Sequence, residues 1–342
     1  MEPIFHFRLP SGCFEDPFLF VRLLRERRAL QFDLGDISSL SASELYKISD
    51  VFVTHTHIDH FIGFDILLRA ILRRETPLNI YGPPNITACV AGKLRGYAWN
   101  LIRDYPLIIN VFAYNGRTLS HSVFRAKNRL RREAGSVTDC DGTLLNDNLF
   151  RVRAVKLSHG TPCIAYSLEE ECHINIDKDR LMRKGLDVGP WLTTFKKMLR
   201  ENSPSGGTLQ ISGKTYRIDQ LAEIATLTKG QKISFATDIA VTKGNIARLI
   251  DLVKDSDVFF CEAYYLEKER ALAKERFHLT AKICGSIAKR AGAKKLVVIH
   301  VSPKYMDNPD AVIAEAMEEF REKAGSNSDV RKAVLPPATS AF

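Results

Sequence analysis

Three imidazoles and one carboxylate lie within six residues of this chain, at His55, His57, Asp59 and His60. Neutral imidazole and carboxylate groups bind zinc, and manganese and iron accept the same ligands. The apolar, β-branched stretch Val51-Phe52-Val53 comes directly before them and predicts a strand that ends where the histidines begin. Because side chains alternate along a strand end, His55 and His57 can point the same way. The turn that follows aims the other two ligands at a second point, so the spacing predicts a site with two metal centres.

Three more candidate ligands stand at the ends of predicted strands. His159 closes the strand 152–158, Asp238 follows 233–237, and His300 follows 295–299. Strand ends open into loops that line crevices, which is where α/β proteins place such ligands. Each residue alone is equally well explained as a buried polar group that is hydrogen-bonded. Together with the first cluster they form a donor set for two ions: His55, His57 and His159 for one, Asp59, His60 and His300 for the other, and Asp238 as the bridge.

Short apolar runs alternate with helical periodicity along most of the chain, which predicts a layered α/β fold. Helical patterns follow the histidine cluster near 66–71 and recur at Ile246–Val253 and Ala281–Ala291. The predicted strands are Ala29–Asp33, Asp50–Thr54, Leu78–Tyr81, Ile108–Ala113, Phe150–Leu157, Lys232–Ala236, Val258–Cys261 and Leu296–His300. With 45% hydrophobic residues among 342, the chain can build one large domain, which we expect over 1–324.

Three segments depart from this pattern. Residues 115–149 are polar and predict an insertion, and residues 174–216 are rich in Lys, Asp, Gly, Ser and Pro and predict an excursion from the core. The tail from 325 to 342 shows no helix or strand signal, so we expect it to be frayed.

Hydropathy and cysteine usage narrow the class of protein. No apolar run approaches the roughly 20 residues of a membrane span, and the N-terminus lacks the pattern of a signal peptide. The seven cysteines are scattered and form no CxxC pair, as expected for reduced thiols in a cytoplasmic protein without a membrane partner.

The net charge of +9 favours polyanionic partners such as nucleic acid, although a solvated basic surface without a partner gives the same number. The positive charge is concentrated in patches. One patch holds five basic residues within 125–132, another ends the predicted helix near 69–74, and a third surrounds Gly189-Pro190-Trp191.

Several segments resemble the metallo-β-lactamase superfamily and, within it, the ribonuclease Z family. The HxHxDH run at 55–60 identifies the superfamily. Two further segments, His278-Leu279-Thr280-Ala281 and His300-Val301-Ser302-Pro303-Lys304-Tyr305, are more specific to the tRNA-processing branch. Similar segments at 32–36, 80–83 and 158–166 extend the resemblance over most of the chain. The chain departs from the family at Cys261-Glu262-Ala263-Tyr264, where the family often has His-Glu-Ala-Thr.

This resemblance implies an α/β fold, the metallo-β-lactamase αββα sandwich with a protruding insertion. It also implies an endoribonuclease that removes the 3′ trailer from precursor tRNA and works as a homodimer. The family's arm grips tRNA, so the resemblance assigns substrate binding to Gly189, Pro190 and Lys196 in the 174–216 segment. Asp59 would then be a ligand that also orients the nucleophile or accepts its proton.

The chemistry also follows from the residues themselves. Two zinc ions about 3.5–4 Å apart lower the pKa of a bridging water, and the resulting metal-bound hydroxide attacks phosphorus. The leaving oxygen needs a proton, and His278, just before the predicted helix 281–291, is the candidate donor. Glu262 can hold His278 protonated, while Ser302 and Lys304 can meet the scissile phosphate. A structural role is the alternative for Glu262 and for His278.

Two other functions stay open on the sequence alone. The first is a hydrolase of the same fold that acts on a small ester, lactone or cyclic nucleotide. The second is a nucleic-acid-binding relic without chemistry, against which the complete set of seven ligand candidates argues. Trp191 can stack on nucleic acid, but an apolar anchor for the arm is the better interpretation.

Overall fold

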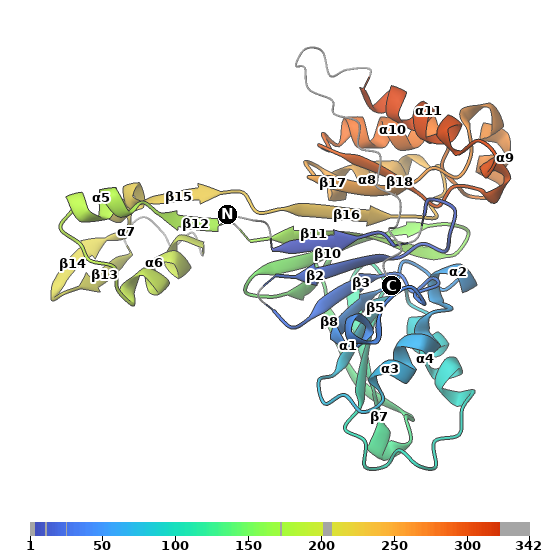
Figure 1. The fold of residues 1–342 in the computed structure, drawn as a ribbon, viewed down its shortest axis with the longest axis horizontal. Coiled ribbons are helices and arrows are strands. Elements are labelled where there is room, and N and C mark those ends of the chain that lie inside the picture. Colours follow the sequence, from blue (N-terminus) through green and yellow to red (C-terminus); the bar gives the residue numbers. More distant parts are fainter. Residues whose placement is uncertain (1–3, 11, 25, 172, 201–206, 322–342) are drawn as a thin grey trace, which may run out of the picture.

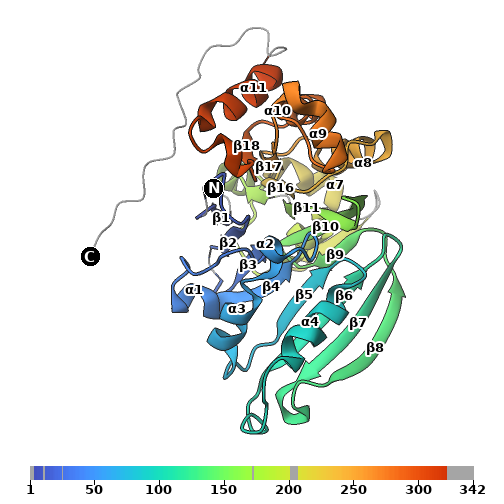
Figure 2. The same ribbon diagram turned by 90° about the vertical axis from the view of Figure 1, so that its right-hand side faces the viewer.

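The computed structural model describes residues 4–10, 12–24, 26–171, 173–200 and 207–321. Two β-sheets lie face to face, and helices cover the outer face of each (Figures 1 and 2). The α/β layering predicted from the sequence is confirmed. The tail predicted for 325–342 and the cysteine at 172 lie outside the described residues.

The first sheet holds eight strands in sequence order. Its central strands β3 to β6 are parallel, and antiparallel strands flank them on both sides. Central parallel strands are buried on both faces, which explains why their sequences read as short continuous apolar runs. The strands are β1 (Phe5–Arg8), β2 (Leu19–Leu23), β3 (Ala29–Phe32), β4 (Ile48–Phe52), β5 (Leu78–Gly82), β6 (Ile108–Tyr114), β7 (Thr118–Arg125) and β8 (Arg132–Asp139).

The second sheet has six strands in the order β18-β17-β16-β11-β10-β9, with β16, β17 and β18 parallel. Strand β10 runs antiparallel to β11, which runs antiparallel to β16, so β10 and β16 end at the same edge. The strands are β9 (Thr143–Asn146), β10 (Phe150–Ser158), β11 (Pro162–Glu170), β16 (Lys232–Ala236), β17 (Val258–Glu262) and β18 (Leu296–Ile299).

The helices bury their periodic apolar faces against the two sheets. Leu67 and Val90 pack on the first sheet, whereas Leu249 and Ile287 pack on the second. The first sheet carries α1 (Ala42–Lys47), α2 (Ile58–Phe61), α3 (Phe64–Ile71) and α4 (Ile86–Arg95), and the second half of the chain adds α8 (Lys243–Val253), α9 (Arg270–Glu275), α10 (Ala281–Arg290) and α11 (Pro309–Arg321).

A cluster of aromatic side chains fills the space between the sheets. Phe52 of β4 lies 5.6 Å from Tyr166 of β11, and Phe32 lies 6.0 Å from Phe235, both measured between ring centroids. The Tyr166 hydroxyl donates to the carbonyl oxygen of Val53 at 2.6 Å. The end of β4, where the histidine run begins, is therefore held directly against the second sheet.

The segment 115–149 forms edge strands. Strands β7 and β8 extend the first sheet, with the short 3₁₀ helix η1 (Ala126–Asn128) between them, and β9 begins the second sheet. Six of the eight residues of β8 are exposed in succession, from Ala134 to Asp139. A strand with solvent on both faces needs no apolar alternation, which is why its sequence reads as a polar insertion.

An arm projects from the second sheet and carries its own small core (Figure 1). Its stalk is the antiparallel pair β12 (His173–Ile176) and β15 (Ala225–Thr228), so the excursion runs to Thr228. Phe195, Leu181 and Leu221 are buried within it. Between the stalk strands lie α5 (Lys178–Arg183), α6 (Trp191–Arg200), β13 (Thr208–Ile211), β14 (Lys214–Arg217) and α7 (Ile218–Leu221).

In the part of the chain that the structure describes, no helix combines the length and the apolar character that crossing a membrane requires. The six cysteines in that part carry free thiols.

Candidate metal centre

Each predicted donor follows the carboxyl end of a strand, and these ends meet at one edge of the two sheets. Strand β4 of the first sheet leads to the histidine run, while β10, β16 and β18 of the second sheet lead to His159, Asp238 and His300. The site is therefore a seam between the sheets, and the order of the strands brings residues together that are far apart in sequence.

The histidine run itself lies in a loop after β4, because the strand ends at Phe52. The carboxylate of Asp33 accepts hydrogen bonds from the backbone N–H of Thr54 at 2.6 Å and from its hydroxyl at 2.8 Å. These bonds turn the chain out of the sheet. His57 then occupies the N-cap of α2, so the expectation of histidines on a strand end is corrected to a loop and a helix start.

The first predicted ligand group is assembled in the structure. One ligand atom from each of His55, His57 and His159 lies within 4.8 Å of the others. His159 uses its Nδ1 in a 2.8 Å hydrogen bond with the carbonyl oxygen of Phe277, which directs its Nε2 into the site. His55 is buried and places its Nδ1 3.1 Å from the hydroxyl of Thr54.

The second predicted group is also assembled: one ligand atom from each of Asp59, His60 and His300 lies within 4.8 Å of the others. His60 donates from Nδ1 to Asp33 at 2.9 Å and turns its Nε2 toward Asp238, 2.7 Å away. Nε2 of His300 lies 3.4 Å from the carboxylate of Asp59.

Asp238 lies between the two groups, at the position predicted for the bridge. Its carboxylate oxygens are 3.9 Å from Nε2 of His55, 3.5 Å from Nε2 of His159 and 3.4 Å from Nδ1 of His300. The side chain is buried. A carboxylate with two oxygens at this position can bind one ion on each side.

The donor set fits a divalent cation. Nε2 of His55 and Nε2 of His60 are buried and have no assigned hydrogen-bond partner among the described residues, and Nε2 of His60 faces the carboxylate of Asp238 at 2.7 Å. Buried polar atoms normally have partners, and two orphaned imidazole nitrogens facing a carboxylate are satisfied by a metal ion. Histidine and aspartate donors suit zinc, manganese and iron.

The donor set combines ionised carboxylates with imidazoles of two kinds, those whose pKa is lowered and those whose pKa is raised. Burial, with His60 nearby, lowers the pKa of His55 to about 2, so its imidazole is neutral. Burial would raise the pKa of Asp238, but His300 and His60 outweigh it and hold that pKa well below its usual range. Burial would raise the pKa of Asp59, but the neighbouring imidazoles of His300 and His60 outweigh burial and lower it. Asp238 in turn outweighs burial and raises the pKa of His60 and that of His300, the latter to about 10. Because metal ligation requires neutral imidazoles, a bound cation would displace the protons from these two rings.

His278 and Glu262 form a pair that adjoins the donors, and with Asp238 and His300 they make up a further group of potential ligands. Nδ1 of His278 lies 2.9 Å from the carboxylate of Glu262 and 3.2 Å from that of Asp238. Glu262 is buried at the end of β17 and also accepts from the backbone N–H of Ile239 at 2.6 Å. His278 stands just before α10, as predicted, and Thr280 caps that helix.

Two features of the site were missed by sequence reasoning. The ring of Tyr264 stacks on His278, with centroids 3.9 Å apart and planes 11° apart, within the segment 261–264 where the chain departs from the family motif. Asp33, Asp238 and His300 adopt left-handed backbone conformations, with φ of 54°, 56° and 51°. Non-glycine residues at positive φ are uncommon and cluster at functional sites, but no residue pattern marks them in advance.

The predicted phosphate contacts lie near the last ligand. Ser302 is buried, and its backbone N–H donates to the carbonyl oxygen of Tyr264 at 3.1 Å. Lys304 is exposed and pairs with Glu269, with its ammonium 5.4 Å from the ring centroid of Tyr265. A phosphate that uses Lys304 must therefore compete with Glu269.

Gly189, Pro190 and Lys196 lie in the arm, where Gly189 and Pro190 precede α6 and Lys196 lies on it. Trp191 is half-buried and packs 6.0 Å from Phe195 in the core of the arm. Trp191 therefore anchors the arm, which agrees with the preferred interpretation of this residue.

No family model matches the chain, but it is similar in sequence to several proteins named ribonuclease Z. The chain is 31% identical to ribonuclease Z of Limosilactobacillus reuteri over 293 residues, which cover 83% of this chain and 82% of that protein. It is 29% identical to ribonuclease Z of Deinococcus radiodurans over 279 residues, 79% of this chain and 81% of that protein.

Solved structures support the fold. The short form of human tRNase Z superposes with a TM-score of 0.50 at 18% identity, covering 87% of this chain and 90% of that one. The metallo-β-lactamase-fold protein YhfI from Bacillus subtilis gives a TM-score of 0.51 at 14% identity, covering 92% of this chain and 91% of that one. The two sheets with outer helices are therefore a metallo-β-lactamase fold, as predicted.

Proposed function

The chain belongs to the ribonuclease Z family of metal-dependent hydrolases, and on this premise we propose that it is an endoribonuclease that removes the 3′ trailer from precursor tRNA. The observation that carries the proposal is the convergence of seven imidazole and carboxylate donors at one seam, with the His278–Glu262 pair next to them. The positive net charge of +9 suits a polyanionic substrate.

Two divalent ions, zinc first among the candidates, would be held by the two donor groups with Asp238 shared. Such ions lower the pKa of water and neutralise charge on the phosphoryl oxygens. The chain itself fixes the direction of the imidazoles. Asp33 and the carbonyl oxygen of Phe277 occupy Nδ1 of His60 and of His159, so that Nε2 of each faces the site.

Proton movement is assigned to two residues. Asp59 is partly exposed, and its ionised carboxylate orients the attacking water or accepts its proton. His278 is bound at Nδ1 by Glu262, which leaves Nε2 to deliver a proton to the leaving oxygen. The stacked ring of Tyr264 keeps the imidazole in this orientation.

The arm binds the tRNA at a distance from the metal centre. It projects on a two-stranded stalk and exposes Pro190 and Lys197, with Gly189 and Lys196 half-exposed beside them, so the proposed tRNA contact lies on this surface. We also propose the homodimer typical of the family, in which the arm of one copy reaches toward the other.

The decisive experiment is cleavage of a precursor tRNA with a 3′ trailer, with the cut site mapped, by the wild type beside Asp59→Ala. We expect one cut next to the discriminator base for the wild type and none for the variant. If the metal-loaded wild type leaves the precursor intact but hydrolyses a chromogenic phosphodiester, the substrate is a small ester and the tRNA proposal is wrong.

A further inference from the structure

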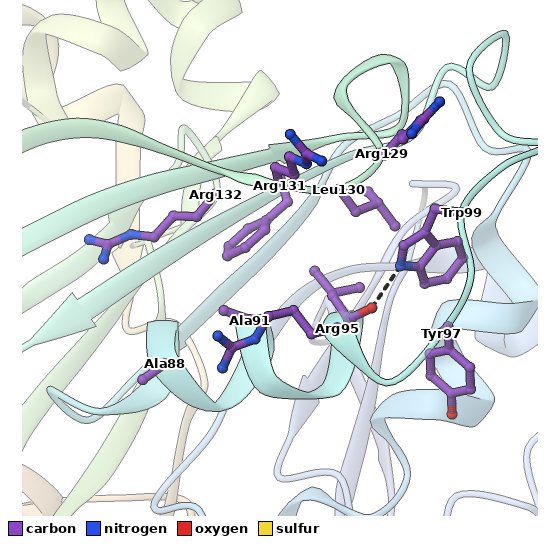
Figure 3. A pocket seen from close by; sticks show the side chains of 11 residues that line it. Ala88, Ala91, Arg95, Tyr97, Trp99, Arg129, Leu130, Arg131 and Arg132 are labelled. Carbon is purple, nitrogen blue, oxygen red and sulfur yellow. Dashed lines mark hydrogen bonds between the residues drawn. The ribbon is translucent and has the colours of Figure 1, made fainter.

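A groove lies on the helix-covered side of the first sheet, between α4 and the turn that joins β7 to β8 (Figure 3). Its volume is about 570 Å³. We call it the arginine groove, after the four guanidinium groups on its rim. The residues that matter here are Arg95, Tyr97, Trp99, Arg129, Arg131 and Arg132. It is distinct from the metal centre and from the arm.

The arginines are uncompensated. All four are exposed, and none forms an ion pair with any carboxylate in the described ranges. Glu133, the carboxylate next to them in sequence, is paired with Arg125. Positive groups around a groove whose lining contains no carboxylate repel each other and create a field that attracts an anion.

The spacing of the arginines indicates an extended anion. In Figure 3, Arg132 lies at one end of the groove and Arg129 at the other, with Arg131 between them and Arg95 on the opposite wall. A single small anion is bound by donors that converge on one point. Donors spread along a groove suit a chain of phosphates.

Aromatic rings complete the groove. Trp99 is half-buried, packs on the core and donates from its indole N–H to the carbonyl oxygen of Leu94 at 2.7 Å. Tyr97 is 49% exposed and meets Trp99 edge to face, with centroids 5.7 Å apart. Aromatic rings beside arginines are the combination that binds single-stranded nucleic acid, because unpaired bases stack on the rings.

The turn that carries the arginines is rigidly built. Arg129 and Leu130 are consecutive non-glycine residues at φ of 52°. Their backbone N–H groups donate to the carbonyl oxygens of Ala126 and Arg125 at 2.8 and 2.9 Å, and Leu130 is buried in the core. The buried leucine holds the unusual turn, which presents its neighbours Arg129 and Arg131 to solvent.

Helix α4 connects the groove to the metal centre. At its start, the side-chain amide of Asn85 donates to the hydroxyl of Thr56, inside the histidine run, at 2.7 Å. At its end, Arg95 lines the groove. The ten residues of the helix span about 15 Å, which corresponds to four or five stacked nucleotides at roughly 3.4 Å each.

We propose that the arginine groove binds the single-stranded 3′ trailer, several nucleotides beyond the scissile phosphate. This inference rests on the proposed function, since the trailer is the unpaired RNA next to the cut. Trailer phosphates pair with Arg95, Arg131 and the neighbouring arginines, and a trailer base stacks on the exposed ring of Tyr97. A short trailer does not reach the groove, so the groove makes cleavage sensitive to trailer length.

The test compares precursors that are identical except for trailers of about two and about ten nucleotides, chosen to fall short of and to exceed the length of α4. The double variant Arg95→Gln/Arg131→Gln removes one charge from each wall. Lys254→Gln/Lys295→Gln is the matched control, because both lysines are exposed and lie at the opposite end of the second sheet from His300.

We expect the groove variant to raise KM for the long trailer by about tenfold, with kcat unchanged, and to leave KM for the short trailer within about twofold. The slope of log KM against log salt for the long trailer should fall by about 1.4, or 0.7 for each of two phosphates. The control should change neither value. Equal effects on both trailers, or no effect, would overturn the inference.

Binding of a fluorescent trailer oligonucleotide, the uncleavable product, separates the two proposals. The groove variant should bind it about tenfold more weakly than the wild type and the control. If the wild type cuts no precursor and this loss is still seen, the proposed function fails and the groove stands as an RNA site. If precursors are cut and oligonucleotide binding is unchanged in the variant, the groove inference alone is wrong.

Discussion

At the scale of single residues, the site is organised by partners that hold the imidazoles. Asp33 binds Nδ1 of His60, the carbonyl oxygen of Phe277 binds Nδ1 of His159, and Glu262 binds Nδ1 of His278. In each case the other nitrogen is left for function. Such partners fix the tautomer and the direction of a ring, and their loss typically weakens metal binding without removing a ligand.

Asp33→Asn should lower metal affinity by about 10–100-fold, because the amide does not hold His60 as the carboxylate does. Activity at saturating metal should largely return. The measurement is competition with a chelator of known affinity. Asp36→Asn, an exposed neighbour, is the control and should bind metal as the wild type does. Wild-type affinity in Asp33→Asn would refute the positioning role.

His278→Ala should slow hydrolysis of a chromogenic diester by about 10²–10⁴-fold, the range for general acid–base catalysis, with metal content unchanged. Metal content is measured by mass spectrometry on the same samples. Tyr264→Phe keeps the stacked ring and should retain most activity. Loss of metal from His278→Ala would identify it as a ligand or a structural residue.

The sequence predicted most of these residues. Histidine and aspartate at strand ends identified seven donors, and the structure brings all of them together. It did not reveal that Tyr264 stacks on His278, because that contact joins the end of β17 to the start of α10 and depends on the packing of both. The left-handed backbone at Asp33 was likewise not visible in residue types.

At the scale of elements, charged pairs tie neighbouring strands of the second sheet together. Glu169 of β11 lies 2.8 Å from Arg151 of β10 and 3.2 Å from Lys232 of β16. Burial would raise the pKa of Glu169, but Lys232 and Arg151 outweigh burial and lower it below its ordinary value near 4.5. This carboxylate therefore stabilises the sheet only while it is ionised.

The sign of the pH dependence follows. Stabilisation by Glu169 is complete above its ordinary pKa and is lost as the pH falls through the lower, folded-state pKa. We expect Glu169→Gln to reduce the urea midpoint at about pH 6 and to match the wild type at about pH 2. Asp251→Asn controls for the loss of one exposed charge. A difference that stays constant with pH would contradict this account.

The arm can be deleted while its stalk strands stay paired, because Ile176 and Ala225 lie opposite each other in the stalk. Replacing 177–224 by Asn-Gly closes the stalk as a hairpin. We expect kcat/KM for precursor tRNA to fall by about 100-fold or more, equivalent to about 2.7 kcal/mol of lost binding, while hydrolysis of a chromogenic diester changes little. Equal losses on both substrates would show that the arm supports the fold and not substrate binding.

Elements with a buried face were predictable, and those without one were not. The predicted strands at 78–81 and 232–236 match β5 and β16 to within one residue, because burial imposes apolar runs. Strand β8 was interpreted as an insertion because it lies at the edge, where solvent reaches both faces. Strand β8 is held by its hydrogen bonds to β7, and the residue pattern of the segment 132–139 alone does not predict this pairing.

At the scale of the whole molecule, the excess of positive charge sets how binding responds to salt. The net charge is +9, with basic side chains on the arm and along the arginine groove. An RNA that covers several of these groups releases counterions when it binds, whereas a small diester meets only the metal centre.

We therefore expect KM for precursor tRNA to rise steeply with salt, with a slope of log KM against log salt of about 0.9 for each helical phosphate contacted. The KM of a chromogenic diester should change little over the same range. Parallel measurements on one enzyme preparation provide the control. The same slope for both substrates would mean that salt acts on the metal centre or on the fold.

The seam between the two sheets also has a consequence during protein synthesis. The donors extend from the loop after β4 to His300, which follows β18, so 245 of the chain's 342 residues separate the first donor, His55, from the last. A nascent chain on the ribosome holds only part of the set until His300 has emerged and β18 has paired with β17. Unfinished or prematurely terminated chains should therefore be unable to cleave RNA, and nuclease activity should appear only in molecules whose second sheet is complete.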